Sequence, residues 1–275
     1  MPHFTAPDGA SLWYEDEGEG LPLLCLSGLT RNTRDFDYVA PHLDGVRMIR
    51  MDYRGRGRSD WTGADTYDVR VEMADALALL DLLELDKVAV LGTSRGGLIG
   101  MLMATGAKER MLGLALNDIG AVVEGAGLEA IRGYVGKHPP QDTLDAAAEA
   151  RMQASAAAFP GVPLSRWREE VEHHVEATPE GLRLRYDVAL ASTLGDGTAT
   201  ATSSDLWKLY DRIAPLPCAV IHGVNSDLLS DATVEEMARR NPGLIVAHVP
   251  DRAHIPFLDE PEALAALSAW LEQMR

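Results

Sequence analysis

The segment at residues 88–97, VAVLGTSRGG, constrains the fold more than any other part of this 275-residue chain. Its first four residues form an uninterrupted apolar run rich in valine, which is typical of a central parallel strand covered on both faces. Gly92, Ser94 and Gly96 then form a G-x-S-x-G pattern, which predicts a sharp turn from the strand into a helix. The glycines let strand and helix approach closely, so the turn lifts the hydroxyl of Ser94 above the sheet. We therefore predict Ser94 to be a nucleophile, with the backbone amide of Arg95 beside it as an oxyanion donor.

Strand and helix patterns alternate on both sides of this segment. Further buried strands are predicted at 21–26, 46–51, 111–116, 218–221 and 244–249, with a weaker edge strand at 11–15. Helical patterns are predicted near 33–42, 67–85, 98–107, 232–240 and 260–274. The apolar face of the long helix at 67–85 is predicted to consist of Val71, Ala74, Leu77, Ala78 and Leu82. Such alternation predicts an α/β fold whose parallel strands are joined by right-handed crossovers.

Residues 121–204 interrupt this alternation. The segment has no clear apolar strand and is rich in Ala, Glu and Arg, which predicts helical pieces at 127–135, 142–159 and 164–176 and a loop at 195–204. We interpret it as a helical cap inserted into a core made of residues 1–120 and 205–275. The cap is predicted to lie as a lid over the carboxyl ends of the strands.

Two residues near the end of the chain are candidate partners for Ser94. A serine nucleophile needs a base and the base needs an orienting acid, and in open α/β sheets such groups lie on loops at the carboxyl ends of strands. His254 follows the last predicted strand, and Asp227 follows the strand before it. We predict the triad Ser94, Asp227 and His254, in the chain order expected of a nucleophile elbow. Asp118, which follows the strand at 111–116, is the alternative acid.

Together these motifs make the chain resemble the helical-cap branch of the α/β-hydrolase superfamily. The resemblance rests on Ser27-Gly28-Leu29 as an oxyanion turn, 52–59 as D-x-R-G-x-G-x-S, 92–97 as the elbow, 223–227 as the acid loop and 253–256 as the histidine loop. It implies a mostly parallel, twisted sheet of the eight-stranded type flanked by helices, and backbone donors to an oxyanion at Leu29 and Arg95. Ser27 and Ala253 stand where the family usually has histidine and glycine, which puts the geometry of both loops in question.

The resemblance implies a serine hydrolase that cleaves a small carboxylic ester or a lactone. Carbon–carbon bond hydrolysis of a diketone-type substrate, amidase or aminopeptidase activity, and a small-molecule receptor on the same fold are the alternatives. The candidate substrate-binding residues are Arg31, Asp118, Tyr134, Trp167 and Tyr186.

Composition excludes several other classes of function. The net charge of −17 argues against nucleic-acid binding and against anionic membranes, because both need clustered Lys and Arg. No apolar run approaches the roughly 18 residues of a membrane span, and no signal peptide is visible, so a cytoplasmic monomer or homodimer is expected.

Cys25 and Cys218 lie in apolar runs and are predicted to be buried thiols. No cofactor or metal motif is found, and His173 and His174 are interpreted as surface helix residues.

Overall fold

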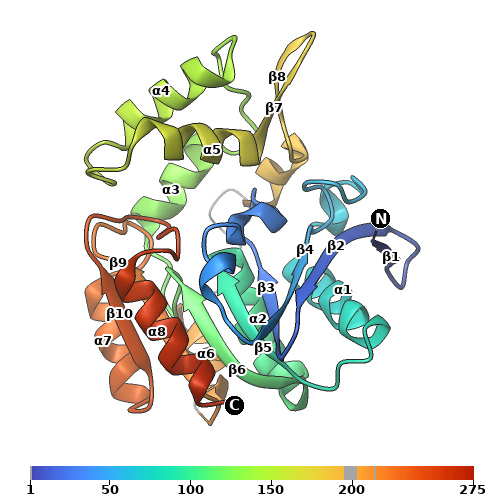
Figure 1. Cartoon of the computed structure of the whole chain (residues 1–275), viewed down its shortest axis with the longest axis vertical. Helices are drawn as coiled ribbons and strands as arrows, with labels where there is room; N and C mark the ends of the chain where they lie inside the picture. Colours follow the sequence, from blue (N-terminus) through green and yellow to red (C-terminus); the bar gives the residue numbers. More distant parts are fainter. Residues whose placement is uncertain (1, 195–202, 214) are drawn as a thin grey trace.

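An eight-stranded sheet forms the centre of the computed structural model, which describes residues 2–194, 203–213 and 215–275 (Figure 1). Its strands are β1 (His3–Thr5), β2 (Ser11–Gly18), β3 (Leu21–Leu26), β4 (Val46–Met51), β5 (Val88–Thr93), β6 (Met111–Asn117), β9 (Cys218–Gly223) and β10 (Ile245–Val249). Their order across the sheet is β1-β2-β4-β3-β5-β6-β9-β10. β2 is antiparallel to its two neighbours and all other neighbouring pairs are parallel. The mostly parallel eight-stranded sheet predicted from the sequence is confirmed, and only the short β1 was not predicted.

The central position of β5 follows from its apolar sequence. All six of its residues are buried, and Leu91 pairs in register with Cys25 of β3 and Ala115 of β6. A strand that is covered on both faces needs apolar side chains on both, which explains the unbroken VAVL run. The nucleophile-elbow segment therefore begins at the middle of the sheet, where neighbouring strands fix its position.

Helices cover both faces of the sheet. On one face, α1 (Val69–Leu82), α2 (Arg95–Gly106), α6 (Ser203–Ile213) and α7 (Asp231–Arg240) contribute side chains to one apolar cluster. On the other face, α8 (Pro261–Glu272) packs through Leu267 and Trp270. The predicted helix at 33–42 is instead two short 3₁₀ turns, Thr33–Phe36 and Ala40–His42. Among the described residues, no helix combines the length and the apolar character that a membrane crossing requires.

The buried face of α1 differs from the predicted one. Ala74 and Leu82 are exposed, whereas Glu72 and Asp75 are buried together with Leu79. Buried arginines pair with both carboxylates, and such pairing permits charged side chains in a core. A pattern of apolar residues alone could not find this face, since two of its positions carry charge.

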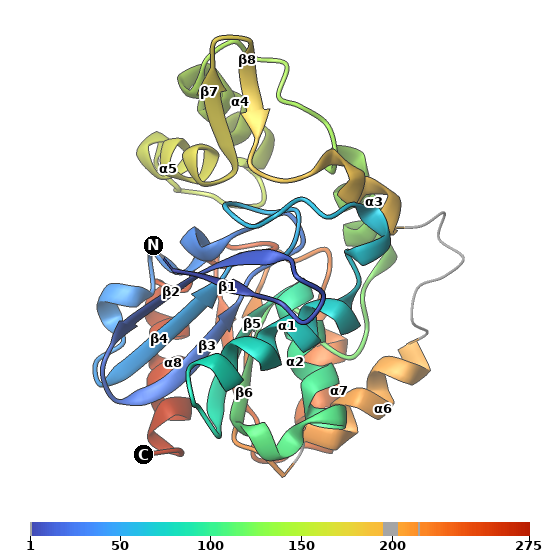
Figure 2. The ribbon, with the colours of Figure 1, turned by 90° about the vertical axis from the view of Figure 1, so that its right-hand side faces the viewer.

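The segment between β6 and α6 lies above the carboxyl ends of the strands (Figure 2). It contains α3 (Gly125–Tyr134), α4 (Leu144–Ser155), α5 (Leu164–His174) and a hairpin of β7 (Val175–Thr178) and β8 (Gly181–Leu184). No clear apolar strand was expected in this segment, but the structure contains these two short strands. They pair with each other and not with the main sheet. Their side chains add to a separate apolar cluster that includes Trp167. Most of the predicted loop at 195–204 falls outside the described residues.

Candidate active site

Ser94 occupies a strained position between β5 and α2. Its backbone has φ +50° and ψ −114°, a conformation that side-chain-bearing residues rarely adopt. Its amide donates to the carbonyl of Asn117 at 3.0 Å, which ties the turn to β6. A Cβ atom at Gly96 would lie 1.9 Å from the carbonyl oxygen of Leu26, so that position requires glycine. The close approach of strand and helix predicted from the G-x-S-x-G pattern is present.

A hydrogen-bonded chain runs from Ser94 through His254 to Asp118. The Oγ of Ser94 lies 2.9 Å from Nε2 of His254, and Nδ1 of His254 lies 2.8 Å from Oδ2 of Asp118. The carboxylate can only accept, so Nδ1 carries the proton and Nε2 is left free to accept one from the serine. The Asp118 carboxylate also accepts from the amide of Gly223 at 2.9 Å and from the hydroxyl of Ser226 at 2.6 Å. Asp118 is fully buried and held from three sides.

The predicted contact between Asp227 and His254 is wrong. Asp227 is exposed, and within the described part of the chain its carboxylate makes no hydrogen bond or ion pair. The loop that carries it instead contributes Gly223 and Ser226 to the Asp118 carboxylate. The order of strands brings both loops to the same edge of the sheet, since β9 lies beside β6. Which of the two acids faces the histidine depends on loop conformation, and sequence order does not contain that information.

The predicted oxyanion donors are the backbone amides of Leu29 and Arg95. Gly28 and Leu29 line the same pocket as Ser94 and His254. Within the described residues, the backbone N–H of Leu29 has no hydrogen-bond acceptor. Arg95 is the first residue of α2, and the first amides of a helix have no partner inside it. Both donors are therefore free for a ligand.

A buried charge network, which the sequence did not reveal, joins the segments that carry these amides. The guanidinium of Arg56 donates to the carbonyl of Leu29 at 2.8 Å and to Glu72 at 2.8 Å. The other carboxylate oxygen of Glu72 accepts from Arg95 at 2.7 Å. Arg56 and Glu72 are fully buried. Glu72 thus links the Leu29 turn to the start of α2 through two arginines.

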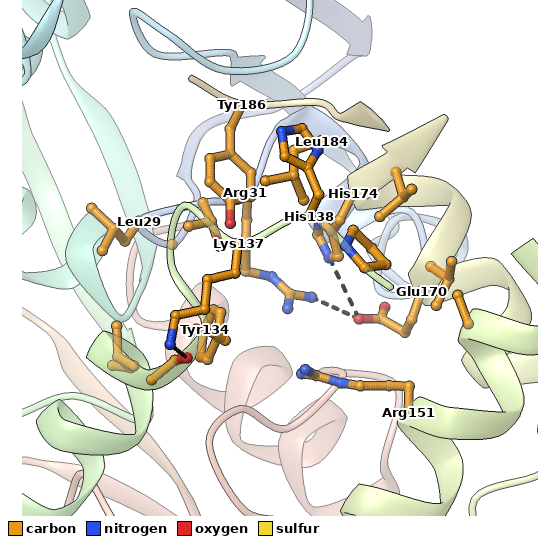
Figure 3. A pocket seen from close by; sticks show the side chains of 18 of the residues that line it. Leu29, Arg31, Tyr134, Lys137, His138, Arg151, Glu170, His174, Leu184 and Tyr186 are labelled. Atoms are coloured by element: carbon orange, nitrogen blue, oxygen red, sulfur yellow. Dashed lines mark hydrogen bonds and ion pairs between the residues drawn. The ribbon is translucent and has the colours of Figure 1, made fainter. Parts of the chain in front are cut away.

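A cavity of about 380 Å³ opens from Ser94 and His254 toward the segment above the sheet (Figure 3). This volume is in the range of small-molecule sites. Of the predicted substrate-binding residues, Tyr134 and Tyr186 line it, and the hydroxyl of Tyr186 accepts a hydrogen bond from the Gly136 amide. Trp167 is not among the lining residues, because its side chain packs from α5 into the separate apolar cluster and is buried there. Asp118, also a candidate, contacts His254 instead.

Arg31 lines the same cavity, but its charge is already balanced. Its guanidinium pairs with Asp35, and Nη2 lies 3.0 Å from Glu170 of α5. Burial acts to raise the pKa of Glu170, but the positive charge of the Arg31 guanidinium beside it acts in the opposite direction, and the pKa lies below its usual range. The guanidinium that was expected to bind a substrate carboxylate thus already binds two carboxylates of the protein.

His173 and His174 are not the surface residues that the sequence suggested. His173 is 3% exposed and stacks on Tyr38, while His174 lines the cavity beside Glu170. Desolvation lowers the pKa of His173 to about 3 and also lowers that of His174. Both rings are therefore neutral at pH 7, with His173 buried and the side chain of His174 20% exposed at the cavity.

This burial predicts that the protein loses stability in mild acid. An unfolded histidine has a pKa near 6.5, so between pH 6.5 and about 3 the unfolded chain binds a proton that the folded His173 does not. The free energy of unfolding should fall by about 1.4 kcal/mol per pH unit for this residue as the pH drops below 6.5. His173→Phe, which keeps a ring against Tyr38 but cannot titrate, should reduce that slope in urea unfolding at pH 7, 6 and 5. Identical slopes for the two proteins would contradict the prediction.

Comparisons with known proteins agree with this fold. Residues 23–267 match the model of the alpha/beta hydrolase family, and the chain belongs to that family. It is 36% identical over 253 residues to a 3-hydroxybutyrate-oligomer hydrolase of Cupriavidus necator, covering 88% of this chain and 85% of that protein. An alpha/beta hydrolase structure from Novosphingobium aromaticivorans matches with a TM-score of 0.92 at 34% identity, covering 99% of this chain and 97% of that one. An esterase from Exiguobacterium antarcticum, 20% identical with 98% of each chain covered and a TM-score of 0.73, shares the fold.

Proposed function

We propose that this chain is a serine hydrolase that cleaves a small carboxylic ester bearing a free carboxylate, such as a short oligomer of a hydroxy acid. The observation that carries the proposal is the hydrogen-bonded series Ser94, His254 and Asp118, whose first two members line a cavity of about 380 Å³. In this proposal, the segment above the sheet acts as a cap that forms the substrate pocket.

The geometry supports a two-step mechanism. His254 takes the proton of Ser94 as the oxygen attacks the ester carbonyl, and Asp118 stabilises the imidazolium that forms. The amides of Leu29 and Arg95 stabilise the oxyanion of the tetrahedral intermediate. The imidazolium then protonates the departing alcohol, which leaves an acyl group on Ser94. His254 finally activates a water molecule that releases the acid.

The charges of the cavity support an anionic substrate. The chain has 42 acidic residues against 25 Lys and Arg, yet among the described residues the cavity is lined by Arg31, Lys137 and Arg151 and by a single carboxylate, Glu170. Arg31 is already paired with Glu170 and with Asp35 behind it. Lys137 donates to the carbonyl of Gly133, and in the described residues neither Lys137 nor Arg151 pairs with a carboxylate. Figure 3 shows Arg151 extending toward the middle of the pocket and the amine of Lys137 beside Tyr134, so both cations border the space that a substrate carboxylate would occupy. The 3-hydroxybutyrate oligomers in the name of the Cupriavidus necator relative would carry such a group at one end.

Turnover of two esters would test the proposal. Wild type should hydrolyse both p-nitrophenyl butanoate and the linear dimer of 3-hydroxybutyrate, and Ser94→Ala should hydrolyse neither. The double variant Lys137→Gln/Arg151→Gln should raise KM for the anionic dimer at least tenfold and leave KM for the neutral ester within twofold, because only the dimer needs their charge.

The two parts of the proposal fail separately. No turnover of either ester by folded wild type would overturn the hydrolase assignment and favour carbon–carbon hydrolysis or a receptor role. Ester turnover with equal KM changes for both substrates in the double variant would overturn the anionic substrate alone.

A further inference from the structure

Three potential metal ligands converge outside the pocket, at the edge of the sheet formed by β9 and β10. His222 and His248 are directly paired in register on these neighbouring strands, and Asp231 begins α7. The two Nδ1 atoms lie 3.2 Å apart. Oδ1 of Asp231 lies 3.5 Å from Nδ1 of His222 and 3.7 Å from Nδ1 of His248. Elsewhere in the described chain no comparable group of three is found.

The environment of His222 fixes which of its nitrogens can bind a metal. Its ring is buried, and Nε2 lies 3.0 Å from the carbonyl oxygen of Leu229. A carbonyl only accepts, so Nε2 carries the proton and Nδ1 presents a lone pair. This lone pair lies within hydrogen-bonding distance of Nδ1 of His248, at 3.2 Å, and 3.5 Å from the carboxylate of Asp231. A carbonyl that orients a histidine in this way is the usual outer partner of a metal-binding imidazole.

The spacing of the three atoms matches a tetrahedral site. Zn²⁺ bonds to histidine nitrogen and carboxylate oxygen are about 2.0–2.2 Å long, so tetrahedral ligand atoms lie about 3.3–3.6 Å apart. The separations of 3.2, 3.5 and 3.7 Å are close to this range. His248 and Asp231 are half-exposed or more, which leaves a fourth position open to water. Two imidazoles and one carboxylate suit a first-row divalent transition metal.

We propose that His222, Asp231 and His248 bind a divalent transition-metal ion of the zinc type. The ion would join β9, β10 and the first turn of α7, and so close both ends of the loop between His222 and Asp231. That loop supplies Gly223 and Ser226 to the carboxylate of Asp118. The ion's role is therefore to brace this loop, and it does not touch Ser94 or His254.

Titration of chelator-treated protein with ZnCl₂ tests the site. Calorimetry should give one Zn²⁺ per wild-type chain, and Co²⁺ should give the visible absorption of a tetrahedral site. His248→Ala and Asp231→Asn should each weaken binding at least tenfold, because each removes one of three ligands. Both side chains are exposed, so the metal-free variants should unfold at the wild-type temperature.

A distant histidine serves as the control. His42 is exposed and has no contact with this site, so His42→Ala should bind Zn²⁺ as wild type does. Zn²⁺ should raise the unfolding temperature of wild type and His42→Ala but not that of the two ligand variants. Absence of binding by wild type, or equal affinity in wild type and both ligand variants, would overturn the proposal.

Discussion

Asp118→Asn should lower kcat for p-nitrophenyl butanoate by about 10⁴-fold. The carboxylate of Asp118 accepts from Nδ1 of His254 and so keeps the lone pair on Nε2, facing Ser94. An asparagine amide can turn its NH₂ group toward Nδ1, which stabilises the wrong tautomer and leaves no base for the serine. KM should change little, since Asp118 is fully buried and does not line the cavity.

Asp227→Asn is the matched control for this experiment. It makes the same chemical change one strand away, at an exposed carboxylate without a hydrogen-bond partner in the described chain. We expect kcat to stay within twofold of wild type. Thermal unfolding of both variants separates lost chemistry from lost folding, because Asp118 also holds Gly223 and Ser226. A large loss in Asp227→Asn with little in Asp118→Asn would reverse the assignment of the acid.

Glu72→Gln should reduce the free energy of unfolding by about 3–5 kcal/mol. Glu72 is fully buried, and its two oxygens accept from Arg56 and Arg95. Its removal leaves two arginines without their shared counter-charge in a site with little water, and this cost exceeds that of an ordinary hydrogen bond. Urea unfolding at neutral pH measures the change. The folded fraction of the variant should also have a lower kcat, since Glu72 links the segments of Leu29 and Arg95.

Asp81→Asn on the same helix provides the comparison. Asp81 pairs with Arg110 at 2.8 Å, but its side chain is 67% exposed. An exposed ion pair contributes at most about 1 kcal/mol, so this variant should be close to wild type in stability and in kcat. If Glu72→Gln were no more destabilising than Asp81→Asn, the buried network would not be an important part of the fold.

Much of the fold could be predicted because its signals are local. The apolar run of β5 and the glycines at 92 and 96 specify a buried strand and a tight turn wherever they occur. The alternation of such runs with helical patterns then specifies a mostly parallel sheet. The segment above the sheet was harder to predict, since β7 and β8 are four residues each and only half-buried. Such short strands carry too few apolar positions to show a period of two.

The polar contacts of the site were the least predictable part. Asp118 and Asp227 both follow strands and both precede a helix, so their sequences do not distinguish them. Glu72 lies on a helix face that looked polar, and His173 lies on a helix that looked exposed. Each is buried because a partner from a distant segment reaches it.

The sequence alone therefore determined the sheet, the elbow with Ser94, and the position of His254 on the loop after the last strand. These features depend on backbone sterics and on apolar burial, which act over a few neighbouring residues. Tertiary structure decided that Asp118 faces His254, that Arg31 is neutralised within the protein, and that Glu72 joins two arginines. Those outcomes depend on which charged groups meet at about 3 Å, and that distance is set only when loops far apart in the chain come together.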